Sequence, residues 1–159
     1  MAITETDLRH LRRCVELAHE ALGNGDEPFG SLLVDADGTV LFEDRNRVGG
    51  GDATAHPEFA IARWAAARVA PSARAHTTVY TSGEHCPMCS AAHAWVGLGR
   101  IVYATSTAQL SGWLDEWGLS PGPVAALPIS QVAPAVPTDG PVTEFTDAVK
   151  ALYRDAFCR

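Results

Sequence analysis

Two short segments carry residues that could bind a metal, and each lies where a helix is expected to begin. The first, TAHPEFAIARW, places His56 directly before Pro57 and Glu58. The second, TSGEHCPMCSAAHAW, places Cys86 directly before a proline and Cys89 three residues further on. Proline is favoured at the first position of a helix because its missing N–H would have had no partner there. Each segment therefore predicts a helix whose start presents a possible metal ligand.

The residue types at these two helix starts suit zinc. Sulfurs three residues apart project to one side of a helix, and the helix N-terminus favours the thiolate that a metal needs. Together with His56, Cys86 and Cys89 would leave the fourth tetrahedral position of zinc open, as in catalytic rather than structural sites. A water there would have a pKa of about 7. Glu58 is not needed as a ligand, so it would be placed to carry protons.

Each motif has a simpler interpretation when it is taken alone. A single histidine at a helix start is more often a cap or a satisfied polar group. A C-x-x-C pair could be a redox pair or half of a structural zinc site, although this chain lacks a second C-x-x-C. The other cysteines, Cys14 and Cys158, are interpreted as bystanders. The upstream H-x-E combined with the downstream C-x-x-C favours catalytic zinc.

The pattern of apolar residues and breakers predicts the elements that position these motifs. Helices are expected at about 6–22, 57–70, 87–97 and 143–157, and strands at 31–34, 40–46, 77–82 and 100–106. The Pro- and Gly-rich stretch at about 111–141 is the least regular part, with one short strand expected around VAALPI. This order predicts an α/β fold, a three-layer α/β/α sandwich with a central mixed five-stranded sheet. We expect a single domain over 1–159, with a less regular tail from about 108.

Composition restricts the possible partners and location. The 159 residues are 47% hydrophobic and 19% charged, as expected for a globular domain. The net charge of −7 disfavours a nucleic-acid partner, because phosphate contacts require basic surfaces. The densest basic patch, on the first helix, is interpreted as a solvated face and comprises Arg9, His10, Arg12 and Arg13. No apolar run is long enough for a membrane span and no signal peptide is visible, so a cytoplasmic location is expected.

The chain resembles the cytidine deaminase superfamily, nearest its guanine deaminase and tRNA-adenosine-deaminase-like branch. The matching segments are EPFGSLLVD, RNRV, DATAHPE, TSGEHCPMC and RIVYATS, within about residues 5–107. The resemblance implies zinc held by His56, Cys86 and Cys89, with Glu58 as the acid/base residue. It also implies hydrolytic loss of ammonia from an amino-bearing base.

The resemblance also implies substrate contacts. Asn46 matches an asparagine that hydrogen-bonds the substrate, Phe29 lines the pocket, and Ala55 is expected beside them. His85 stands where the family usually has proline; it is either a spare ligand or, as we favour, a residue that lines the cavity or pairs with the backbone. In GWLDEWG, Asp115 or Glu116 is a candidate second proton shuttle, although Leu114 falls where one acid is expected.

The tryptophans are candidate aromatic walls, because flat bases favour stacking. Trp113 and Trp117 are expected over the pocket, whereas Trp95 is expected in the core.

The sequence therefore predicts a zinc-dependent hydrolytic deaminase of a small nucleobase or nucleoside, with a guanine-like purine favoured over cytosine or cytidine. A tRNA-specific adenosine deaminase and a non-catalytic zinc-binding module are the alternatives. Glu58 argues against the second alternative, because a structural site has no use for an unligated carboxylate. By analogy with the superfamily, we expect a homodimer in which the tail helps to close the partner's pocket.

Overall fold

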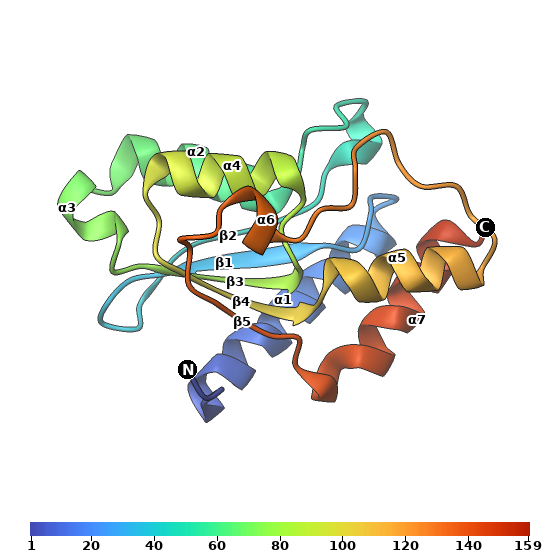
Figure 1. Ribbon diagram of the computed structural model, residues 1–159, viewed down its shortest axis with the longest axis horizontal. Helices are drawn as coiled ribbons and strands as arrows, with labels where there is room; N and C mark the ends of the chain where they lie inside the picture. Colours follow the sequence, from blue (N-terminus) through green and yellow to red (C-terminus); the bar gives the residue numbers. More distant parts are fainter.

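A mixed sheet of five strands runs through the middle of the protein (Figure 1). The computed structural model describes residues 1–159. The strands are β1 (Gly30–Val34), β2 (Val40–Arg45), β3 (Thr78–Gly83), β4 (Arg100–Thr105) and β5 (Thr138–Asp139). The helices are α1 (Glu5–Gly23), α2 (Pro57–Arg68), α3 (Pro71–Arg74), α4 (Pro87–Val96), α5 (Thr107–Glu116), α6 (Ile129–Val132) and α7 (Thr146–Phe157), with 3-10 turns η1 (Val48–Gly50) and η2 (Thr143–Phe145).

The strand order is β2–β1–β3–β4–β5. β1 pairs antiparallel with both β2 and β3, whereas β4 lies parallel to β3 and to β5. β1 is buried along its whole length, because successive side chains point to opposite faces and both faces are covered. Leu32 packs into one apolar core and its neighbour Leu33 into the other.

Helices cover both faces of the sheet (Figure 1). On one face, α1 and α7 pack over a core that includes Leu11, Val102 and Val149. On the other face, α2, α4 and α6 pack over a core that includes Ile61 and Ile129. The predicted three-layer sandwich with a mixed five-stranded sheet is confirmed.

The close packing of α1 on β1 depends on Gly30. A Cβ at this position would overlap the backbone oxygen of Cys14 and the side chain of Leu17. The glycine of the PFG segment therefore lets the helix lie directly against the strand, which fixes the loop that precedes β1.

The irregular tail differs from expectation in two respects. The short strand predicted around VAALPI is absent, and this segment is a loop that leads into α6. Three prolines in the loop, Pro121, Pro123 and Pro128, remove the backbone donors that a strand would need. The fifth strand is instead β5, which is only two residues long. A helix not expected from the sequence, α5, begins at a capping box formed by Ser106 and Gln109.

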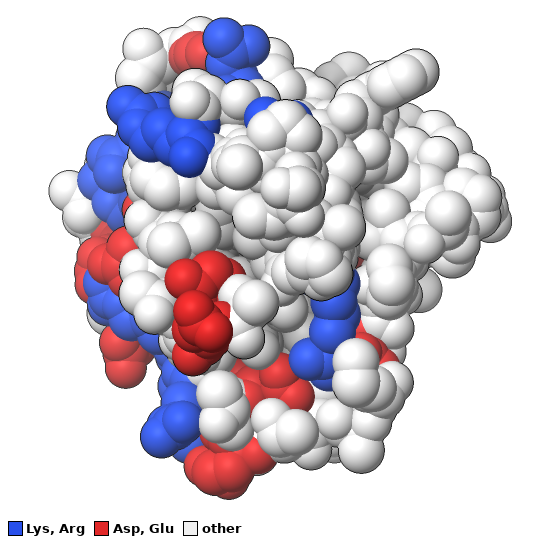
Figure 2. All heavy atoms as spheres, turned by 90° about the vertical axis from the view of Figure 1, so that its left-hand side faces the viewer, with Lys and Arg blue, Asp and Glu red and all other residues white.

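The charged surface is mixed in sign. Arg12 bonds to Glu5 and Glu144, and Arg13 bonds to Glu16, Glu20 and Glu43. On the face shown in Figure 2, basic side chains (blue) and acidic side chains (red) are interspersed among uncharged residues. The three arginines of the α1 patch thus lie on a solvated face, as predicted, and Arg9 bonds to Thr6. His10 is instead half-buried against the ring of Tyr80, with centroids 4.6 Å apart. No helix of the protein combines the length and apolar character that crossing a bilayer requires.

Candidate functional site

The three candidate metal ligands meet between the N-termini of α2 and α4. The Nδ1 atom of His56 lies 3.6 Å from the Cys86 sulfur and 3.7 Å from the Cys89 sulfur. All three donor atoms lie within 4.8 Å of one another. Ligand atoms of tetrahedral zinc, with Zn–S bonds of about 2.3 Å, are separated by about 3–4 Å. One imidazole and two sulfurs at these separations fit a zinc ion with one further position.

The backbone at the two helix starts explains how the ligands converge. His56 is the N-cap of α2 and Cys86 is the N-cap of α4, both in extended conformation and both followed by proline. Because a cap residue is not yet helical, its side chain can turn toward the neighbouring helix. Cys89 lies in the first turn of α4, which packs beside α2 (Figure 1).

The two neighbouring thiols differ in acidity. The hydrogen bond from Cys89, helped by His56 and opposed by burial, lowers the pKa of Cys86 to about 4. The same hydrogen bond and burial raise the pKa of Cys89. The pair thus supplies one thiolate at neutral pH, and metal binding would displace the remaining proton.

Glu58 lies beside the metal donors and is held by the sheet. Its Oε1 accepts hydrogen bonds from Thr81 Oγ1 at 2.8 Å and from Ser31 Oγ at 3.1 Å. Its Oε2 lies 3.8 Å from the Cys89 sulfur. Burial raises the pKa of Glu58, and the Thr81 hydroxyl opposes that rise. The arrangement leaves Oε2 available for proton transfer next to the metal donors.

A cavity of about 520 Å³ opens from the metal donors. Its inner end is formed by His56, Glu58 and Cys86, together with Glu27 and Phe29 from the loop before β1. One side is formed by α5, and the outer end by residues 119–122 and 124–126 and by Phe157. This volume is typical of small-molecule sites.

The residues expected to contact substrate fall into two groups. Phe29 lines the cavity and packs on Tyr153, with ring centroids 5.3 Å apart. Asn46 and Ala55 are not on the cavity wall. Asn46 is buried behind it: its Oδ1 accepts the backbone N–H groups of Glu27 and Val48, and its Nδ2 has no partner. Asn46 therefore fixes the loop that carries Glu27.

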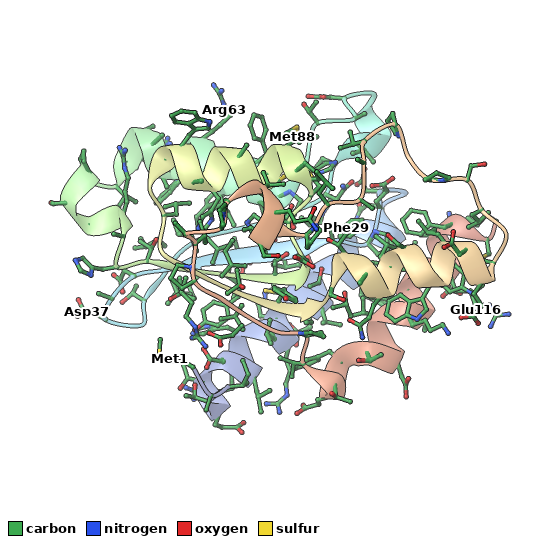
Figure 3. The ribbon with its side chains drawn as sticks, viewed as in Figure 1. Met1, Phe29, Asp37, Arg63, Met88 and Glu116 are labelled. Atoms are coloured by element: carbon green, nitrogen blue, oxygen red, sulfur yellow. The ribbon has the colours of Figure 1, made fainter.

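The candidate residues from the GWLDEWG segment also lie in different places relative to the cavity. Asp115 lies at the exposed mouth of the cavity. Glu116 points away from it at the outer end of α5 and bonds to Lys150 at 3.0 Å (Figure 3). Trp113 packs on Tyr153 at 5.9 Å, and Trp117 packs against the α1–α7 core, so neither forms the expected wall. Only one side of α5 faces the cavity, and the residues on that side include Leu110, Leu114 and Asp115.

Two further expectations are wrong. Trp95 is 90% exposed on the outer side of α4 rather than in the core. His85 neither lines the cavity nor bonds to the backbone. Its ring is fully buried edge-on to His93, with centroids 5.4 Å apart, and it is not one of the clustered metal donors.

Two acids in the cavity were missed. Glu27 lines its inner end, and burial raises the pKa of this carboxyl while His56 opposes the rise. Glu84 accepts the N–H of Thr107 at 2.8 Å and the N–H of Ile129 at 2.9 Å, at the starts of α5 and α6. The only sequence signal for either was its place within a matching segment, Glu27 in EPFGSLLVD and Glu84 in TSGEHCPMC.

Comparison with known proteins agrees with this geometry. A family model described as the cytidine and deoxycytidylate deaminase zinc-binding region matches residues 4–105. A probable cytosine deaminase of Schizosaccharomyces pombe is 34% identical over 121 residues, 75% of this chain and 72% of that protein. A guanine deaminase of Bacillus subtilis is 36% identical over 96 residues, 59% of this chain and 61% of that protein.

Solved structures share the fold. The structure of guanine deaminase from Bacillus subtilis superposes with a TM-score of 0.57 and 26% identity, covering 91% of each chain. The structure of a guanine deaminase from Nitrosomonas europaea superposes with a TM-score of 0.71 and 20% identity, covering 100% of this chain and 87% of that one.

Proposed function

This chain is a deaminase of the cytidine and deoxycytidylate deaminase family, and on that premise we propose that it releases ammonia from the exocyclic amine of a small nucleobase or nucleoside. We favour a guanine-like purine over cytosine or cytidine. The observation that carries the proposal is a buried carboxylate, Glu58, beside three metal donors that leave a coordination position open.

Zinc is the metal of this family's binding region, and we assign it to His56, Cys86 and Cys89. When bound, it supplies a Lewis acid that makes water nucleophilic at neutral pH. Glu58 takes a proton from the attacking water through Oε2, while Oε1 stays fixed by Thr81 and Ser31. Glu58 then returns protons to a ring nitrogen and to the departing amine. A C–O bond forms at the ring carbon, its C–N bond breaks, and ammonia leaves.

The rest of the cavity supports an uncharged, flat substrate. Phe29 offers an aromatic surface at the inner end, and Leu110 and Leu114 line one side. Asp115 stands at the mouth, where we propose that it can exchange protons with the substrate. Because no Lys or Arg lines the cavity, a tRNA substrate is disfavoured.

The purine preference is supported by likeness to the guanine deaminase of Bacillus subtilis in both sequence and fold. Likeness to a probable cytosine deaminase keeps the pyrimidine as the competing substrate. By analogy with the superfamily, we further propose that residues 1–159 form one deaminase domain that assembles as a homodimer in the cytoplasm.

Ammonia release tests the proposal directly. The purified protein, with its zinc content measured, is assayed against guanine, guanosine, cytosine, cytidine, adenosine and a tRNA anticodon stem. We expect one zinc per chain and turnover of guanine or guanosine above all others. Zinc-loaded protein that releases no ammonia from any of these compounds would overturn the proposal.

A further inference from the structure

The carboxylate of Glu27 is an unpaired acid at the inner end of the cavity. Its backbone N–H bonds to Asn46 Oδ1 at 3.3 Å, which fixes the residue in the loop before β1. Its side chain is half-buried and lines the same wall as His56 and Phe29. Glu27 makes no side-chain hydrogen bond or ion pair within the protein, whereas its neighbour Asp26 bonds to Arg45 at 2.7 Å.

The other carboxyl groups in the cavity have different surroundings. Glu58 is held by two hydroxyls, and both oxygens of Glu84 accept backbone N–H groups. Asp115 is exposed at the mouth. No Lys or Arg faces this group of acids, and two thiolates would balance the charge of a zinc ion. The inner cavity is therefore negative, and Glu27 is the half-buried acid at its inner end whose carboxylate has no partner.

We propose that Glu27 is a specificity-determining residue that accepts a hydrogen bond from an N–H or O–H group of the substrate and excludes substrates that carry a phosphate. The inference rests on the proposed function. A half-buried carboxylate without a protein partner gains from a ligand that supplies a donor, because removing an unmatched charge from water is costly. The same charge repels a phosphate more strongly than it would in open water. Glu27 thus selects free bases or nucleosides over nucleotides.

Two substitutions distinguish the effect of the negative charge of Glu27 from the effect of its hydrogen-bond acceptor. Glu27→Gln keeps the shape of the side chain and one acceptor oxygen but removes the charge. Glu27→Ala removes both. The matched control is Asp37→Asn, which also removes one negative charge. Asp37 is exposed in the β1–β2 hairpin, at the end of the molecule away from Phe29 (Figure 3).

The measurement is the dissociation constant of guanosine and of guanosine 5′-monophosphate at matched zinc content, by calorimetry in a Glu58→Gln background that prevents turnover. With Glu27 intact, guanosine should bind at least about tenfold more tightly than its monophosphate. Glu27→Gln should shrink that ratio by about tenfold and leave guanosine binding within about threefold. Glu27→Ala should shrink it equally and also weaken guanosine by about tenfold, whereas Asp37→Asn should change neither. Raising the salt concentration should shrink the ratio only while Glu27 is charged.

The outcomes also separate this inference from the proposed function. An active, zinc-loaded wild type together with a ratio that does not change in Glu27→Gln would overturn the inference and leave the deaminase proposal intact. Equal losses of affinity for both ligands would indicate a merely structural role for Glu27. Protein with Glu27 intact that binds the monophosphate as tightly as guanosine, or binds neither, would also overturn the inference.

Discussion

The hydroxyl of Thr81, in the middle of the sheet, donates a 2.8 Å hydrogen bond to the carboxylate of Glu58, at the start of α2. The hydroxyl of Ser31, on the neighbouring strand β1, contacts both groups, at 2.9 Å from Thr81 and 3.1 Å from Glu58. All three side chains are buried. The sheet therefore orients the carboxylate, and only Oε2 faces the metal donors.

Replacing Thr81 by valine tests this orientation. Valine keeps the shape of threonine but cannot donate, so Glu58 should lose the shorter of its two hydroxyl hydrogen bonds while the three metal donors stay in place. We expect kcat to fall by about tenfold or more, with zinc content unchanged and KM nearly unchanged. Kinetics and metal analysis on the same preparation check this. Thr81→Ser, which restores the hydroxyl, should recover most of the activity; equal loss in both variants would point to packing instead.

Glu58→Gln tests the proton-carrying role itself. Glutamine keeps the size of the side chain but cannot accept a proton from water, so turnover should fall by at least about 10²–10⁴-fold. Zinc should remain bound, because Glu58 is not one of the three donors. Ammonia release and zinc analysis provide the measurements. Full activity in this variant would refute the assigned role.

The metal donors could be predicted from sequence because their arrangement is local. His56 and Glu58 share one helix start and Cys86 and Cys89 share another, so only the meeting of two helices had to be inferred. The alternation of strands and helices up to Thr105 likewise follows from apolar periodicity. Both features depend on short-range rules that one sequence contains.

The cavity wall could not be predicted because it depends on how distant segments pack. Glu27 is significant only because α5 and the following loop close a space in front of it. β5 is too short for any periodic pattern, and Pro137 precedes it directly. Trp95 was misplaced because burial of a helix aromatic is a statistical rule, and here α4 directs that side outward.

Glu84 should stabilise the position of the cavity wall formed by α5 and the loop that follows it. Its two oxygens hold the N–H groups of Thr107 and Ile129, which bracket α5 and the loop that closes the cavity. Glu84→Ala should raise KM by about tenfold while kcat stays within about threefold, since each lost bond to a charged acceptor is worth about 1.5–3 kcal/mol. The exchange rates of the two amides, measured by hydrogen–deuterium exchange, should rise together.

Glu84→Gln provides the graded control for that prediction. Glutamine offers one acceptor oxygen and places a donor against the other N–H, so only one of the two amides should stay protected. A lower melting temperature with unchanged KM in both variants would mean that Glu84 stabilises the fold without shaping the cavity.

Far from the metal site, Asp7 joins the start of α1 to the sheet. Its carboxylate accepts hydrogen bonds from the Thr4 backbone, the Tyr80 hydroxyl at 2.7 Å and Arg100 at 3.0 Å. Burial raises the pKa of Asp7, but these hydrogen bonds outweigh it and lower the pKa to about 2. The folded pKa lies below the ordinary value of 3.8, so the ionised form is favoured by folding.

Asp7→Asn should therefore destabilise the protein in a pH-dependent way. The stabilisation by Asp7 is fully present above about pH 5, where the carboxyl is ionised even in the unfolded chain, and is lost as the pH falls toward 2. A shift of this size corresponds to about 2 kcal/mol.

We expect the difference in unfolding free energy between wild type and Asp7→Asn, measured by urea titration, to be at least that large at pH 7 and to shrink steadily between pH 4 and pH 2. Taking the difference at each pH cancels the effect of zinc release, which both proteins share. A constant difference across this range would mean that the Asp7 carboxylate acts through shape and not through its charge.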